Sequence, residues 1–178
     1  MARYVALLGS INVGGNRLKM ADLVAALEKH GFSGVATVVA SGNVLFDHPR
    51  AAEPALQDEI AKIVQEEFGI ASFAVVRSRA ELEQALAESP FADQGEDKLV
   101  HVHFLAHQPD KDAFDRLVAD HAGRGSERLA LGTRALHIDF VDGVAGSKLT
   151  GGFLEKRLGG KGTARNVRSI GRIIEQLG

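Results

Sequence analysis

Residues 35–46 read VATVVASGNVLF, two short apolar runs on either side of the turn-forming residues 40–43. β-Branched and aromatic runs around a glycine-containing turn are typical of a β-hairpin, whose two strands pair antiparallel. A second hairpin is predicted where residues 132–134 join strands over residues 127–131 and 135–140. Two such hairpins argue against a doubly wound parallel sheet, because parallel neighbours need a long crossover between them.

Helical stripes of apolar residues flank the first hairpin. One stripe begins at Met20 and another ends at Phe68, and both repeat every three to four residues, as one face of an amphipathic helix does. Short apolar strands are predicted at residues 4–8 and 72–76. The first half therefore reads βαββαβ, an order typical of a ferredoxin-like antiparallel sheet with its helices on one face.

The second half repeats this rhythm. A strand is predicted at residues 99–105, a helix follows, and the second hairpin leads to two C-terminal helices separated by the glycine-rich residues 159–162. We expect an α+β fold of two ferredoxin-like (βαββα-type) halves with antiparallel sheets and two C-terminal helices. The expected domains are an N-terminal half, residues 1–88, and a C-terminal half with a helical extension, residues 89–178.

The helical stripes also predict part of the core. Each stripe should turn inward, because burial of one apolar face is what stabilises an amphipathic helix. The residues expected to be buried are Leu23, Leu27, Ile60, Val64, Phe114, Leu117, Phe153 and Ile170.

The composition is that of an ordinary globular protein. Hydrophobic residues make up 45% and charged residues 25% of the 178 residues, enough for a sizeable core. The absence of cysteine excludes disulfides, thiolate nucleophiles and cysteine-ligated metals, and it is compatible with a reducing cytoplasm. The apolar run at residues 4–8 is far shorter than a signal sequence or a membrane span. We expect a soluble, cytoplasmic monomer or homodimer with no membrane partner.

Charge is unevenly distributed along the chain. From residue 146 to the end seven cations accompany two anions, a net charge of +5, so that a total of −2 leaves −7 for residues 1–145. Such polarity favours a small anionic ligand near the C-terminus, or serves only to dock the two regions. The acidic remainder repels a long polyanion, so nucleic acid is the less favoured partner.

Three segments carry hydrogen-bond donors suited to an anion: a glycine-containing loop at residues 9–16, a serine and lysine before a helix at 147–148, and two arginines with an asparagine at 165–168. Each segment also has a structural interpretation, namely a strand-to-helix connection, helix capping by Ser147 and a solvated helix face. The candidate ligand-binding residues are Asn12, Gly14, Gly15, Asn16, Ser147, Lys148, Arg165, Asn166 and Arg168.

Histidines on the predicted strands are possible metal ligands. His101 and His103 alternate with apolar residues and should share one sheet face, and His137 with Asp139 on another strand are candidate neighbours. A metal site needs at least three convergent ligands, and the wet or interfacial sheet face is the better interpretation. No Ser-His-acid set has the spacing of a hydrolase. The sequence therefore assigns no metal site and leaves catalytic residues and cofactors open.

Four motifs follow one another along the chain: LLGSINVGG at residues 7–15, SGNVLF at 41–46, SKLT at 147–150 and TARN at 163–166. Their order and spacing resemble the bacterial family known as domain of unknown function 1697. The resemblance implies a compact α+β protein of ferredoxin-like character with no established activity, substrate or cofactor. This chain departs from the family pattern where Gly9-Ser10 replace Arg-Gly, and where Val167 replaces tryptophan.

Three classes of function remain open from the sequence. The leading hypothesis is binding of an anionic ligand, phosphorylated or nucleic acid. The first alternative is an enzyme acting on a small phosphorylated or acyl substrate, with His137 or Asp139 as a base. The second is a structural or assembly protein that acts through sheet-mediated self-association.

Overall fold

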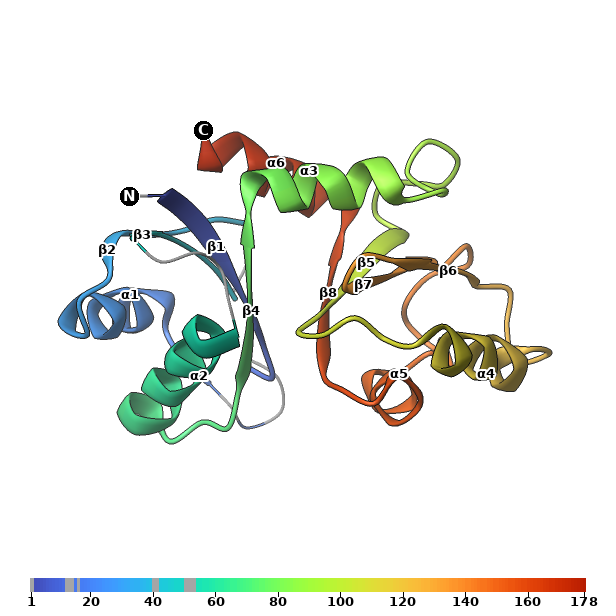
Figure 1. The fold of residues 1–178 in the computed structure, drawn as a ribbon, viewed down its shortest axis with the longest axis horizontal. Coiled ribbons are helices and arrows are strands. Elements are labelled where there is room, and N and C mark those ends of the chain that lie inside the picture. Colours follow the sequence, from blue (N-terminus) through green and yellow to red (C-terminus); the bar gives the residue numbers. More distant parts are fainter. Residues whose placement is uncertain (1, 12–14, 16, 40–41, 50–53) are drawn as a thin grey trace. The chain divides into compact units, whose positions relative to one another are not determined.

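The computed structural model describes residues 2–11, 15, 17–39, 42–49 and 54–178 (Figure 1). The chain forms two compact units, one made of residues 1–82 with 171–178 and the other of residues 83–170. Helix α3 (Arg79–Glu88) and helix α6 (Val167–Leu177) each contribute to both units. We describe the two units separately and call them unit 1 and unit 2.

Unit 1 contains one four-stranded antiparallel sheet and two helices that pack against it. The elements are β1 (Ala2–Gly9), α1 (Met20–Lys29), β2 (Ser33–Thr37), β3 (Asn43–His48), α2 (Pro54–Phe68) and β4 (Phe73–Ser78). The strand order is β2-β3-β1-β4. The predicted first hairpin is confirmed, since β2 and β3 pair antiparallel.

Unit 2 repeats this arrangement. Its elements are β5 (Val100–Leu105), α4 (Lys111–His121), β6 (Arg128–Gly132), β7 (Ala135–Asp139), α5 (Gly151–Leu158) and β8 (Gly162–Asn166), in the strand order β6-β7-β5-β8. Both sheets therefore have the ferredoxin-like order, and the expected α+β fold of two such halves is confirmed. Strand β8 was missed: the sequence prediction placed Gly162 in the connection between two helices, and Arg165 and Asn166 at the start of the last helix.

The core of unit 1 follows from the alternation of side chains along β1. Tyr4, Ala6 and Leu8 lie on the face covered by the helices, where they pack with Leu23 of α1 and Ile60 of α2. Successive strand residues point to opposite faces of a sheet. One face of each helix and one face of the sheet are thereby removed from water.

The core of unit 2 is built in the same way. Leu136 and Ile138 of β7 pack with Leu117 of α4 and Leu154 of α5. Six of the eight residues predicted to be buried are buried in the structure, namely Leu23, Leu27, Ile60, Val64, Leu117 and Ile170. Phe114 and Phe153 are only half-buried. The ring of Phe153 lies beneath two guanidinium groups, those of Arg124 at 4.5 Å and Arg157 at 3.5 Å, so its outer face is covered by cations.

The start of α3 shows how local sequence sets a helix boundary. The amide of Ser78 donates to a carboxylate oxygen of Glu81 at 3.0 Å, and the amide of Glu81 donates to the Ser78 hydroxyl at 3.2 Å. This reciprocal pair is the capping box that the Ser-x-x-Glu spacing predicts. Among the described residues no helix is long and apolar enough to cross a membrane.

Candidate anion-binding site

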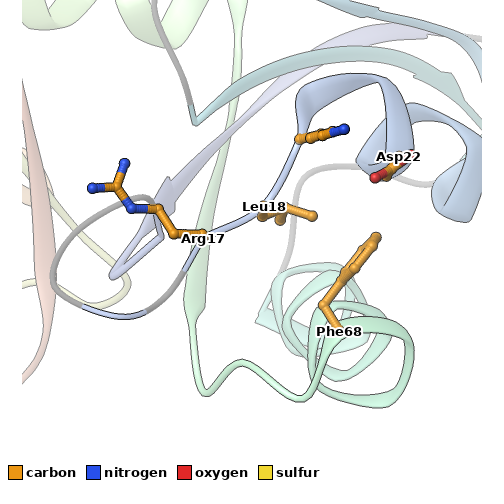
Figure 2. A pocket seen from close by; sticks show the side chains of 5 residues that line it. Arg17, Leu18, Asp22 and Phe68 are labelled. Atoms are coloured by element: carbon orange, nitrogen blue, oxygen red, sulfur yellow. The ribbon is translucent and has the colours of Figure 1, made fainter.

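A hollow of about 400 Å³ lies in unit 1 where the connection from β1 enters α1. Its lining residues are Arg17, Leu18, Lys19, Asp22 and Phe68. Figure 2 shows the ring of Phe68 directed toward Leu18 and Asp22, with the side chain of Arg17 extending away from that ring. The hollow thus has an apolar wall and charged groups around it.

Helix α1 begins at this hollow without a side-chain cap. Its N-cap position is Lys19, an extended residue with φ −79° and ψ 134°, and no side chain accepts a hydrogen bond from the first amides. Lysine has no acceptor atom, so it cannot satisfy them. Because unpaired amides and the helix dipole concentrate partial positive charge at a helix N-terminus, this end of α1 favours an anion.

Two cations add to this potential, and one carboxylate opposes it. Arg17 and Lys19 are exposed, and neither has a carboxylate partner among the residues that the structure describes. Asp22 lies in the first turn of α1, where its charge interacts favourably with the helix dipole. The three side chains leave a net charge of +1, which suits a small anion better than a polyanion.

No described residue of the sequence-predicted loop lines this hollow. Asn12, Gly14 and Asn16 lie outside the described residues. Gly15 is exposed in a turn, and its carbonyl accepts the amide of Arg17 at 3.0 Å. A Cβ added at Gly15 meets nothing within 4 Å, so the space around it is open.

Ser147 and Lys148 lie in unit 2, in the segment before α5. The Ser147 hydroxyl donates to Glu127 at 2.7 Å and accepts the amide of Leu149 at 3.1 Å, so both of its roles are taken inside the protein. The expectation that Ser147 caps α5 is wrong, because Thr150 occupies the N-cap and accepts the amide of Phe153. The neighbouring Lys148 side chain is exposed.

The third predicted segment spans the end of β8 and the start of α6. Nη1 of Arg165 donates to the Thr163 hydroxyl at 2.6 Å and to the carbonyl of Ala164 at 2.9 Å, and burial lowers the pKa of this guanidinium to about 10. Asn166 accepts the amide of Ser169 at 2.8 Å and so caps α6. Arg168 is exposed in the first turn of α6. Our expectation that Arg165 is an exposed side chain is therefore wrong.

The structure does not bring Ser147 and Arg165 together. Ser147 is bonded to Glu127, directly before β6, whereas Arg165 is on β8. Strands β6 and β8 are the two outer strands of the sheet. Three strand spacings separate them, about 14 Å. The two C-terminal groups of candidate residues are thus two separate places in unit 2.

The histidines of unit 2 lie on opposite faces of its sheet. His103 pairs with Leu136, whereas His137 pairs with Val102. Paired residues share a face of the sheet and consecutive residues alternate between faces, so the two imidazoles lie on different faces. The proposed neighbourhood of His101 and His103 with His137 and Asp139 is therefore wrong. Among the described residues, no group of three or more His, Asp or Glu side chains could hold a metal ion.

A second hollow, of about 430 Å³, lies in unit 2 beside Asp139. The Asp139 side chain is only 4% exposed, pairs with the guanidinium of Arg128 and accepts the amide of Val141 at 3.0 Å. Arg128 in turn lies over the ring of Phe91, 4.8 Å from its centroid. Both carboxylate oxygens are therefore engaged within the protein, and Asp139 offers little capacity as a base.

Sequence reasoning missed all five residues that line the first hollow. Arg17 and Lys19 flank Leu18 directly after the glycine-containing loop, and this basic pair was visible in the sequence. Phe68 ends the apolar stripe of α2 and was interpreted only as core. Its half-exposed position beside Leu18 depends on how α1 and α2 pack, which no local pattern encodes.

Comparison with solved structures shows the same fold in a bacterial protein. The conserved bacterial protein SP0830 from Streptococcus pneumoniae matches with a TM-score of 0.73 and 23% sequence identity, over 99% of this chain and 98% of that one. No curated protein matches the chain. The family model described as protein of unknown function (DUF1697) matches residues 1–137, which include the whole of the first hollow. The chain therefore belongs to the DUF1697 family of proteins of unknown function.

Proposed function

We propose that the protein binds a small anionic ligand in the hollow at the start of α1. The observation that carries this proposal is the uncapped first turn of α1 directly after two exposed cations, Arg17 and Lys19. Backbone amides at a helix N-terminus and nearby cations together make an anion site. Gly15 supports it, since its open surroundings allow close approach to the backbone.

A binding role suits the described residues better than the enzymatic alternative. The two base candidates from the sequence are both in unit 2, and neither is available: His137 is fully buried, and Asp139 is paired with Arg128. A general base must reach the proton that it removes. The hollow at α1 offers donors and a net positive charge, which suit binding of an anion.

Replacing both cations tests the proposal. The double variant Arg17→Gln, Lys19→Gln should bind inorganic phosphate at least about tenfold more weakly than the parent, because charged donors strengthen each contact to an anion. Titration calorimetry at low salt measures this loss. Lys62→Gln is the matched control, since Lys62 is an exposed cation of α2 that does not line the hollow.

Two further variants sharpen the result. Asp22→Asn removes the only carboxylate among the described residues that line the hollow, and it should strengthen phosphate binding. Gly15→Ala meets no neighbouring atom, so a loss of binding with an unchanged melting temperature would indicate that the ligand approaches this backbone. Failure of phosphate and phosphate esters to bind the parent at low salt would contradict the proposed function.

The C-terminal candidates remain predictions for a second anion contact in unit 2. Lys148 and Arg168 are exposed and can be replaced without disturbing the core, whereas Arg165 and Asn166 are bonded within the fold. We expect Lys148→Gln and Arg168→Gln each to weaken anion binding if this region contributes. Native mass spectrometry of the parent tests the remaining alternative, self-association through sheet edges.

A further inference from the structure

We infer that the ligand is a small organic anion, in which a single phosphate or carboxylate group is joined to a flat apolar body about the size of an aromatic ring. This inference rests on the proposed function and specifies the chemistry of the ligand at the same hollow. The apolar body would lie against Phe68 and Leu18, with the anionic group at the start of α1.

The hollow is too large for a bare anion. Its volume is about 400 Å³, within the range of small-molecule sites. A phosphate ion displaces on the order of two or three water molecules of about 30 Å³ each. Phosphate alone would therefore leave most of the hollow filled by water in contact with apolar side chains, which is unfavourable compared with filling it by an apolar group.

The wall away from the charges is apolar and includes an aromatic ring. Phe68 is the last residue of α2, and it is only partly covered by the core of unit 1. Its ring points toward Leu18 and Asp22 (Figure 2). A flat ligand group placed beside this ring gains offset or edge-to-face contact in addition to burial of its apolar surface.

The charges limit the ligand to one anionic group. Arg17 and Lys19 line the hollow together with Asp22, which faces any group bound near the first turn. A chain of phosphates would place further negative charge beside that carboxylate, and like charges repel. A monoester or monocarboxylate is neutralised by the cations and suffers less of this repulsion. Nucleic acid and polyphosphates are therefore the disfavoured ligands.

Matched anions test the inference on the intact chain. Phenyl phosphate should bind at least tenfold more tightly than inorganic phosphate, because burial of a phenyl group adds apolar contact. Benzoate distinguishes a carboxylate from a phosphate as the preferred anionic group. Tripolyphosphate should bind no more tightly than phenyl phosphate. Phe68→Leu should remove most of the phenyl advantage.

Controls separate this inference from the proposed function. Phe114→Leu, at a half-buried phenylalanine of α4 that does not line the hollow, should keep the full phenyl advantage. Nuclear Overhauser contacts between the bound phenyl ring and Phe68 in the parent provide a test that does not depend on how any variant folds. Equal affinities for phenyl phosphate and inorganic phosphate overturn the inference alone. Tighter binding of tripolyphosphate overturns its charge limit, and the absence of all binding overturns the proposed function as well.

Discussion

His103 should make this protein sensitive to mild acid. The imidazole lies on β5 with 5% exposure, and its Nε2 has no hydrogen-bond partner among the described residues. Burial, and to a smaller extent the charge of His101, lowers the pKa of His103 from 6.5 to about 4. Below pH 6.5 His103 therefore becomes protonated in the unfolded chain but stays neutral in the folded chain. The free energy of unfolding consequently decreases as the pH is lowered. Above pH 6.5 the group has no effect.

The size of this effect follows from the two pKa values. At pH 5 the linkage amounts to about 2 kcal/mol, and below pH 4 it approaches about 3.4 kcal/mol. His101 and His137 also have pKa values lowered by burial, so their contributions have the same sign. Acidic side chains such as Glu88 and Glu127 have lowered pKa values and stay charged between pH 8 and pH 5. The change in unfolding free energy over this interval therefore comes from the histidines.

The variant His103→Leu isolates the contribution of this residue. Urea unfolding of parent and variant at pH 8 and pH 5 should show that the parent loses about 2 kcal/mol more than the variant over this interval. The exposed His107, replaced by Leu, is the control and should leave the parent's pH dependence unchanged. Equal losses in parent and His103→Leu would refute the reasoning, as would an NMR titration of the His103 ring with a midpoint near 6.5.

Other predictions concern packing and capping. Leu27→Ala should cost about 2–5 kcal/mol of unfolding free energy, because Leu27 is fully buried in the core of unit 1, and a urea midpoint within experimental error of the parent would contradict that. Ser78→Ala should cost about 0.5–2 kcal/mol by removing half of the capping box, and calorimetric melting measures it. Gly162→Ala should destabilise unit 2 by about 1–3 kcal/mol, because the new Cβ would lie 2.3 Å from Nε2 of His103. Combined with His103→Ala, the same change should cost less unfolding free energy than the sum of the two single changes.

Much of the fold was predictable because its signals are local. The two hairpins, the helical stripes and the Ser78 capping box each depend on residues close together in the chain, and their periods of 2 and 3.6 can be read directly. Strand β8 carries no such signal. Its residues, Gly-Thr-Ala-Arg-Asn, do not alternate between apolar and polar, and they form a strand because β5 offers an unpaired edge.

The candidate site, too, was predictable only where its signals are local. The sequence alone determined which segments could present donors to an anion, because glycine, arginine and lysine are recognisable wherever they occur. Tertiary structure decided which of these donors are available: Ser147 is bonded to Glu127, Arg165 is half-buried, and Phe68 lies beside Leu18 rather than wholly within the core. It also separated His103 from His137, since a single residue of strand register determines the face. Register and burial depend on pairing between distant segments, and no local pattern contains that information.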